Sequence, residues 1–413
     1  MTAVRGSHAG LVLFLVALLV GGWTTIAGEI TADGVTPCVI TAVIAIIIGE
    51  QMPTAMAGRV IAPVTTAAAT GLVMAPPGEG LARPAAVGVI WLAMLAGVLI
   101  ARVRGRPLFE SALGARFLGI ATTALLVRGL GDSTLVQWAF ADGTRRALAV
   151  LALFGAALVG GLVERLLEAL VVWLREGITI GSFAAREPSS LYGIVGVTAS
   201  AGSLIAVAQP VLDWVAYPLL LLPVLLTHLA VQRAVAIRLT LDESVHALSR
   251  LTEAAGRSHE GHGARVADLS VRIGRAMGLD AHELRKVERT ALLHDVGLMG
   301  IEEPIPGGAT INASTQVQDR AAEAGTRIVS SSPQLRPIAA MLDQVRTPFR
   351  MSREFGEFIP VAARIVRVAN AWDDITEGTR TQRAHQVALE RLHLGLGYDY
   401  DPEVVTALER TLG

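Results

Sequence analysis

The chain has 413 residues, of which 52% are hydrophobic and only 17% are charged, and its formal net charge is −1. An ordinary soluble domain is about 25% charged, so this composition excludes a protein that is soluble along its whole length. The single cysteine, Cys38, excludes an intrachain disulfide and does not imply an oxidising compartment.

The composition changes near the middle of the chain. Residues 1–234 hold 14 basic and 12 acidic residues, a net charge of +2, whereas residues 235–413 hold 21 and 24, a net charge of −3. The first part is therefore apolar, and the second has an ordinary soluble composition and enough length to bury its own core. Its slight acidity argues against a nucleic-acid partner, since non-specific binding needs a basic face.

The apolar first part predicts a bundle of membrane-spanning helices in a lipid bilayer, because a spanning helix needs about 20 mostly apolar residues. Five stretches fit well, at 10–28, 85–102, 146–163, 190–208 and 212–232. Three weaker ones lie at 36–50, 58–75 and 112–130. We therefore expect a transmembrane region over 1–232 with about eight spans, or about six if 36–75 holds a re-entrant or short pair.

Arginines near the span ends predict the orientation, because cytoplasmic loops are rich in basic residues. Arg102, Arg104 and Arg106 mark one such loop, and Arg233 and Arg238 follow the last span. We expect a multi-pass protein of the plasma (inner) membrane with its C-terminal domain in the cytoplasm.

Several ionisable residues belong to this apolar region. Glu50, Arg59, Arg116, Asp213 and His228 all lie near predicted span ends, where we interpret them as interfacial or snorkelling side chains. Ionisable residues deep in the membrane would instead mark a transport pathway. The pattern therefore favours a sensory or anchoring bundle, and a transporter with a regulatory soluble domain is the least favoured hypothesis.

Residues 233–254 follow the last span without glycine or proline and predict a helical connector. They carry an apolar stripe at helical spacing, formed by Leu239, Leu241, Val245, Leu248 and Leu251. Two interpretations stay open: a continuous helix that transmits a movement from the membrane, or the amphipathic first helix of the soluble domain. From the stripe we expect a homodimer.

Three predicted helices of the second part carry polar residues in line with an apolar stripe. His262 continues one stripe, His294 continues the next, and Asn370 and Asp373 extend the third. Buried polar groups cost free energy unless they find partners, and a shared metal ion would satisfy all of them. The adjacent His294 and Asp295 offer a nitrogen and a hard oxygen, which suits Fe, Mn, Zn or Ni. For any one of them alone, a hydrogen-bonded core histidine or a helix-end aspartate is the alternative.

The order of these segments resembles the HD superfamily of metal-dependent phosphohydrolases. The resemblance is narrower to the HD-GYP branch, whose members hydrolyse cyclic di-GMP, and the layout is similar to actinobacterial membrane proteins that carry such a domain. The segments that carry it are 262–269, 291–297, 324–329, 359–375 and 400–405. The resemblance implies an all-α protein, in which a transmembrane bundle precedes a cytoplasmic HD-like helical bundle over 255–413.

Four positions depart from the pattern of the HD-GYP branch. Leu298 stands where that branch has a lysine, Ala321 where it has a further histidine ligand, and Asn370 where it has an aspartate ligand. Residues 342–358 lack its double histidine and its Gly-Tyr-Pro loop. The resemblance then implies a single metal ion rather than a cluster.

The ligands that remain by resemblance are His262, His294, Asp295 and the neutral side-chain oxygen of Asn370. Asp295, and Asp373 as a substitute ligand or base, are the candidate catalytic residues. One divalent ion, Mn, Fe or Zn, is the expected cofactor.

We expect a membrane-anchored phosphohydrolase of signalling that acts on a nucleotide or a cyclic dinucleotide. The alternative is an inactive HD-GYP-like receptor or scaffold that binds a nucleotide or a partner protein. Five arginines near the degraded site predict either an anionic ligand or solvated helix faces: Arg320, Arg327, Arg336, Arg346 and Arg350.

Overall fold

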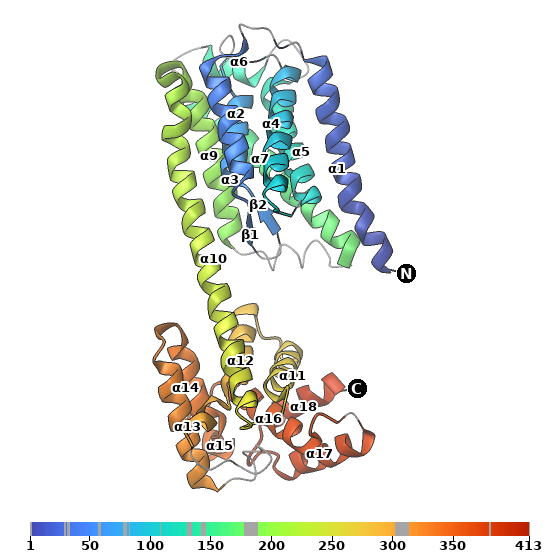
Figure 1. Ribbon diagram of the computed structural model, residues 1–413, viewed down its shortest axis with the longest axis vertical. Helices are drawn as coiled ribbons and strands as arrows, with labels where there is room; N and C mark the ends of the chain where they lie inside the picture. Colours follow the sequence, from blue (N-terminus) through green and yellow to red (C-terminus); the bar gives the residue numbers. More distant parts are fainter. Residues whose placement is uncertain are drawn as a thin grey trace. The chain divides into compact units, whose positions relative to one another are not determined.

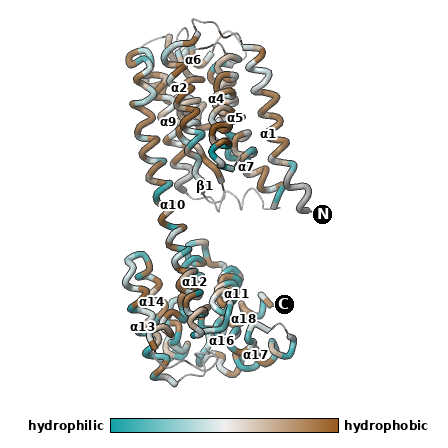
Figure 2. Tube along the Cα trace, in the orientation of Figure 1, coloured by the Kyte–Doolittle hydropathy of each residue, from teal (hydrophilic) through white to brown (hydrophobic). Residues whose placement is uncertain are grey.

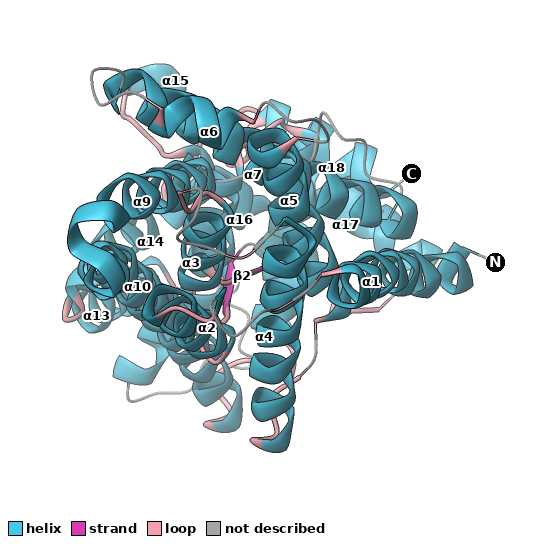
Figure 3. Ribbon diagram, turned by 90° about the horizontal axis from the view of Figure 1, so that it is seen from above, coloured by secondary structure: helices cyan, strands magenta, loops and turns pink. Residues whose placement is uncertain are grey.

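The computed structural model divides the chain into two compact units, Met1–Val235 and Ala236–Gly413. It describes residues 2–28, 30, 34–56, 59–76, 81, 83–107, 109–129, 134–141, 146–176, 189–301, 314–379 and 381–412. Nearly all of the regular structure in these residues is helical (Figure 3), which confirms the expected all-α class. The strands are those of one short hairpin, β1 (Thr54–Met56) and β2 (Arg59–Ile61), which pair antiparallel.

The first unit is a bundle of apolar helices (Figures 1 and 2). Its elements are α1 (Thr2–Ala27), α2 (Pro37–Glu50), α3 (Pro63–Val73), α4 (Arg83–Val103), α5 (Glu110–Arg128), α6 (Leu135–Phe140), α7 (Arg146–Glu176), α9 (Ser189–Leu212), the short η3 (Asp213–Val215) and the first part of α10 (Ala216–Ala254). Trp91 and Phe117 are buried at its centre, with ring centroids 4.6 Å apart.

Among the described residues, five helical segments are long and apolar enough to cross a membrane, and the last of them continues into the second unit. They are His8–Ala27, Pro84–Val103, Glu110–Arg128, Ala147–Arg175 and Gly193–Ala254, the last of which contains both α9 and α10. Between the first two lie α2 and α3, which are shorter apolar helices joined through the β1–β2 hairpin. Neither has the roughly 20 residues that a full span needs.

Several ionisable residues of the first unit lie inside the protein rather than at an interface. Glu50 and Arg116 are 6% and 2% exposed and form an ion pair at 2.7 Å. The prediction that Glu50 and Arg116 are interfacial or snorkelling side chains is therefore wrong. The expected span at 146–163 also continues as α7 to Glu176, because Glu164, Arg165 and Glu168 pair with one another and do not end the helix.

Small residues allow α5 and α7 to approach closely, as is common between membrane helices. A Cβ atom on Gly119 would lie 2.7 Å from the carbonyl oxygen of Gly160, and one on Gly160 would lie 2.0 Å from Oγ1 of Thr123. Neither position can hold a larger side chain without movement of a helix backbone.

The second unit is a separate helical bundle with its own core. Its elements are the last part of α10, then α11 (His262–Ala276), α12 (Ala281–Leu293), η4 (Val296–Gly300), α13 (Thr315–Ser330), η7 (Pro333–Leu335), α14 (Arg336–Val345), α15 (Arg350–Phe355), α16 (Val361–Thr376), α17 (Gln382–Leu394) and α18 (Pro402–Leu412). Helix α16 lies at the centre and contacts α11, α12, α14, α17 and α18. Its buried face includes Ile365, Val366 and Ala369, all fully buried.

The connector residues form the C-terminal half of α10, which continues as a helix to Ala254. Val245 is fully buried in the core of the second unit, with Leu241 and Leu248 packed against that core. Leu239 and Leu251 are 58% and 51% exposed. The expected apolar stripe is thus shared between the domain core and the surface.

The glycine contact between α5 and α7 makes a testable prediction. We expect Gly160→Ala to lower the free energy of unfolding by about 2 kcal/mol, because its Cβ atom collides with Thr123. Gly155→Ala on the same helix is the control, since a Cβ atom there meets nothing within 4 Å. Thermal unfolding of both full-length variants in detergent measures the difference, and equal stability would contradict the close packing.

Candidate metal centre

The ends of three helices bring the expected polar residues together. His262 is the first residue of α11, His294 ends α12 and precedes Asp295, and Asn370 lies in the second half of α16. Each helix buries an apolar stripe in the same core, and α16 contacts both α11 and α12. The stripes therefore place the polar residues at one point, as their spacing predicted.

Acceptor-capable atoms of four residues converge there. The Nε2 atoms of His262 and His294 are 3.2 Å apart. The carboxylate oxygens of Asp295 lie 3.4 Å from Nε2 of His262 and 3.3 Å from Nε2 of His294. The side-chain oxygen of Asn370 lies 2.9 Å from Nε2 of His294.

Contacts behind the two histidines orient their rings. Nδ1 of His294 lies 2.7 Å from the carbonyl oxygen of Ala291, to which it donates. Nδ1 of His262 lies 2.7 Å from Oδ2 of Asp373. Because each Nδ1 donates its hydrogen, a neutral ring directs the lone pair of Nε2 toward the other acceptors. Such partners are typical of histidines that bind metals.

The donor set fits a divalent cation. His262, His294 and Asp295 offer ligand atoms within 4.8 Å of one another. Oδ2 of Asp295 is buried and has no hydrogen-bond partner among the residues that the structure describes. Its neighbour at 3.4 Å is Nε2 of His262, and a cation bound between them would give this buried oxygen a direct partner. Two imidazoles, one carboxylate and one amide oxygen suit Zn, Mn or Fe.

Asp373 lies behind His262 rather than among the converging atoms. Its two oxygens accept hydrogen bonds from Nε and a terminal nitrogen of Arg265, both at 2.8 Å, in addition to the contact with His262. Both oxygens are thus engaged. Asp374 lies beside Asn370, whose amide nitrogen donates to it at 3.3 Å, so the oxygen of Asn370 points toward His294.

Burial and neighbouring charges shift the pKa values of these groups. Burial lowers the pKa of His262, but the hydrogen bond to Asp373 and the charges of Asp295 and Asp374 outweigh it and raise that pKa to about 9. Burial raises the pKa of Asp374 to about 7, with Asp295 and Asp373 adding to the effect and His262 opposing it. Burial also opposes ionisation of Asp373, yet hydrogen bonds from His262 and Arg265 hold its pKa below the usual range.

A glycine contact fixes how η4 packs against α13 beside these residues. A Cβ atom on Gly297 would lie 1.8 Å from the carbonyl oxygen of Ala321, so η4 and α13 touch through their backbones. Gly325, one turn further along α13, faces the backbone of Gly297. The Gly297 of the His-Asp-Val-Gly segment is therefore required for the approach of α13.

A cavity of about 480 Å³ opens beside the converging atoms. Its wall includes His294, Asp295 and Asn370, together with Ala321 of α13 and Tyr400. This volume lies within the range of about 300–1,000 Å³ that is usual for small-molecule sites.

Three arginines line this cavity: Arg346, Arg367 and Arg391. Arg346 pairs with Asp319, and Arg367 with Asp399 at 3.2 Å. Arg391 is exposed, and it forms no ion pair among the described residues. Of the five arginines expected near the site, only Arg346 lines the cavity, and Arg320, Arg327, Arg336 and Arg350 do not.

The sequence patterns did not single out Arg367 or Arg391 as residues of the site. Arg367 precedes Asn370 by three residues and so lies on the same face of α16, a spacing that could have identified it. Arg391 has no comparable signal, because α17 reaches the cavity only through its packing on α16.

Comparison with known proteins agrees with this geometry. Residues 245–404 match the HD domain family, and the second unit is therefore an HD domain of the HD superfamily of phosphohydrolases. This confirms the resemblance seen in the sequence.

A curated relative is also similar to this part of the chain. Over 177 residues the chain is 29% identical to the cyclic di-GMP phosphodiesterase response regulator RpfG of Xanthomonas campestris pv. campestris (strain 8004). The match covers 40% of this chain and 47% of that protein, so the chain spans about half of the relative's length. No solved structure matches the chain significantly.

The pKa of His262 predicts a pH-dependent metal affinity. Without metal, His262 is protonated below about pH 9, whereas a ligand must be neutral, so metal binding displaces a proton. We expect the apparent affinity for Mn²⁺ to rise about tenfold per pH unit between about pH 6 and about pH 8. Calorimetric titration of the full-length protein measures it, and an affinity that is the same at both pH values would contradict the assignment.

Proposed function

We propose that this protein is a membrane-anchored phosphohydrolase that cleaves a phosphodiester of a nucleotide or cyclic dinucleotide with one divalent metal ion. The observation that carries the proposal is the convergence of His262, His294, Asp295 and Asn370 at the wall of a large cavity. The similarity to a cyclic di-GMP phosphodiesterase supports the substrate class.

The proposed roles follow from the contacts of each residue. His262, His294 and Asp295 would hold the ion, with Asn370 as a neutral fourth ligand. A divalent ion supplies polarisation of the phosphate and lowers the pKa of a bound water. Asp295 is the catalytic carboxylate in this scheme. Asp373, with both oxygens engaged, acts as a positioning residue that keeps Nδ1 of His262 occupied.

The cavity suits an anionic ligand of nucleotide size. Its three arginines and two aspartates, Asp295 and Asp399, leave a net charge of +1 on its wall. Arg391 is the arginine available for a phosphate, because Arg346 and Arg367 already pair with carboxylates. Tyr400 adds an aromatic surface on which a base can stack.

The apolar helices of the first unit support anchoring in a membrane. Arg102, Arg104 and Arg106 follow α4 and favour a cytoplasmic position for that end of the unit. We place the HD domain in the cytoplasm on the same ground, since Arg233 and Arg238 follow the apolar half of α10. Homodimer formation through exposed Leu239 and Leu251 remains a prediction.

A second candidate function is a receptor that binds the same class of ligand without turnover. The observation that favours it is Ala321, a cavity-lining residue without a ligand atom at the position where the HD-GYP branch has a histidine. Turnover by the purified protein distinguishes the two functions.

Removal of His294 tests the metal centre. We expect the full-length protein, purified in detergent and loaded with Mn²⁺, to contain about one ion per chain and to hydrolyse bis(p-nitrophenyl) phosphate. In His294→Ala we expect metal content to fall below about a tenth of an ion and hydrolysis to fall at least about a hundredfold, because a ligand is lost. Elemental analysis and a colorimetric assay measure both.

His282→Ala is the matched control, since His282 is an exposed residue at the other end of the same helix. Hydrolysis that survives in His294→Ala would contradict the enzyme. Metal binding without any hydrolysis, even of cyclic di-GMP, would leave the receptor as the function.

Arg391 provides a test of the substrate site. We expect Arg391→Gln to raise KM for a phosphodiester substrate about tenfold while metal content is unchanged, because a charge-assisted hydrogen bond to phosphate is lost. Arg383→Gln near the start of the same helix is the control, since Arg383 is exposed and does not line the cavity. Equal KM values for both variants would exclude Arg391 from phosphate binding.

A further inference from the structure

A small cavity of the first unit gathers three arginines where α4 is followed by α5. Arg102 in the last turn of α4, Arg106 just after that helix and Arg116 of α5 all line it. Among the described residues of the lining, Glu50 of α2 is the one carboxylate. The lining therefore has three positive charges and one negative charge, an excess of +2. We call it the α4–α5 cavity.

The excess charge is not paired within the described part of the chain. Glu50 is already engaged with Arg116, at 2.7 Å. Arg102 and Arg106 are exposed, and neither forms a hydrogen bond or an ion pair with any residue that the structure describes. The carboxylates of α7 that act on the charge of Arg116 lie outside the lining. Because like charges repel one another where they converge, the α4–α5 cavity favours an anion.

Unused hydrogen-bond donors indicate the same kind of ligand. Nε of Arg116 is buried without a hydrogen-bond partner, and the residue is only 2% exposed. Helix α5 begins without a side-chain cap, and Phe109 and Ala112 at its start line the cavity. The first N–H groups of a helix have no partner within it and favour negative charge. Glu110, the acidic residue of that turn, is exposed and lies outside the lining.

The cavity lies where two candidate membrane spans meet the loop between them. Pro84–Val103 ends and Glu110–Arg128 begins at this loop. Val98, Phe109 and Leu113 add apolar surface to the lining. Lipid phosphates lie just outside the apolar core of a bilayer, and basic pockets between membrane helices bind the head groups of anionic lipids. Arginines beside apolar side chains thus suit an amphipathic anion.

The size and the charge of the cavity narrow the choice of ligand. It measures about 40 Å³, which is room for about three water molecules and far below the range of about 300–1,000 Å³ that is usual for small-molecule sites. A whole nucleotide therefore does not fit. A phosphomonoester carries about −1.5 to −2 charge at pH 7 and three strong acceptor oxygens, and so matches an excess of +2.

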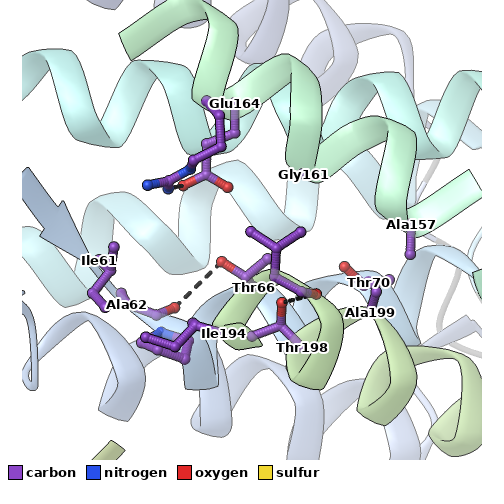
Figure 4. Close-up of a pocket in the computed structure, with 13 residues that line it drawn as sticks. Ile61, Ala62, Thr66, Thr70, Ala157, Gly161, Glu164, Ile194, Thr198 and Ala199 are labelled. Atoms are coloured by element: carbon purple, nitrogen blue, oxygen red, sulfur yellow. Dashed lines mark hydrogen bonds and ion pairs between the residues drawn. The ribbon is translucent and has the colours of Figure 1, made fainter. Parts of the chain in front are cut away.

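A second cavity of the first unit differs from the α4–α5 cavity in its charge. It measures about 30 Å³ and is lined by residues of α3, α7 and α9 (Figure 4). Glu164 and Arg165 both line it, and they pair with each other at 2.7 Å. Its described lining thus has no excess of either charge and does not select a charged ligand.

We propose that the α4–α5 cavity binds one phosphomonoester group, presented by an anionic lipid or by free phosphate. Arg102 and Arg106 bind the phosphate oxygens from the exposed side of the cavity. Nε of Arg116 and the first turn of α5 donate hydrogen bonds from the buried side. The apolar part of the lining contacts the acyl chains when the phosphate belongs to a lipid.

Binding of a short-chain lipid to the full-length protein in a nonionic detergent tests this site. We expect radiolabelled dioctanoyl phosphatidate to bind saturably at about one molecule per chain, and zwitterionic dioctanoyl phosphatidylcholine not to compete. Arg102→Gln and Arg106→Gln should each weaken binding about tenfold, because a charge-assisted hydrogen bond to phosphate is lost. A parallel titration with labelled inorganic phosphate distinguishes the two sources. Saturable binding of phosphate that depends on the same arginines assigns the site to the phosphate group alone, whereas binding of phosphatidate only assigns it to the lipid.

Arg104→Gln is the matched control. Arg104 is exposed on the same loop, lies 3.3 Å from the side-chain oxygen of Gln51 and does not line the cavity, so this variant should bind phosphatidate as the wild type does. An equal loss in Arg104→Gln and Arg106→Gln would mean that the loop attracts anionic lipid only through its general charge, and would overturn the proposal. Arg391→Gln alters the arginine-lined cavity of the HD domain and should also leave this binding unchanged.

Circular dichroism and elution volume check that each variant is folded. The proposal is wrong if folded wild-type protein binds neither phosphatidate nor phosphate saturably. It is also wrong if folded Arg102→Gln and Arg106→Gln bind both probes as well as the wild type does.

Discussion

The contact between His262 and Asp373 is the interaction on which the geometry of the candidate metal centre depends. It joins the start of α11 to the central helix α16 at 2.7 Å and leaves Nε2 of His262 directed toward His294 and Asp295. Arg265 holds the other side of the same carboxylate, so Asp373 is fixed from two directions. Without this support the ring of His262 would be free to turn, and the convergence of ligand atoms would be lost.

The same physical constraint, the cost of a buried charge, shapes both units. In the HD domain it gathers two histidines and a carboxylate at the edge of an apolar core, where Oδ2 of Asp295 makes no hydrogen bond to the described residues and lies 3.4 Å from Nε2 of His262. In the first unit it gathers Glu50, Arg116 and three charged residues of α7 within apolar helices. The group in the HD domain adjoins the cavity of about 480 Å³.

Several positions of the HD domain differ from the pattern of the HD-GYP branch, and these differences affect which ligands its site can accept. Ala321 leaves the wall of α13 without a ligand atom, and Leu298 is buried in place of a charged side chain. The space beside His294 then remains large, and its wall includes Arg346 just after α14, Arg367 of α16 and Arg391 of α17. The proposed site with one metal ion and arginines on its wall would be simpler than a metal cluster, and it would still suit a phosphodiester.

The sequence by itself determined the class of the fold and predicted the residues that meet at the candidate metal centre. Apolar stretches of spanning length and the stripes of α11, α12 and α16 are local patterns, and helical periodicity alone places His262, His294 and Asn370 on buried faces. Only the tertiary structure decided what those residues meet. It assigned Asp373 to the rear of His262, brought Arg391 to the cavity from α17, and paired Glu50 with Arg116 across 66 positions of sequence. These contacts depend on how helices distant in the chain pack, and no local pattern records that packing.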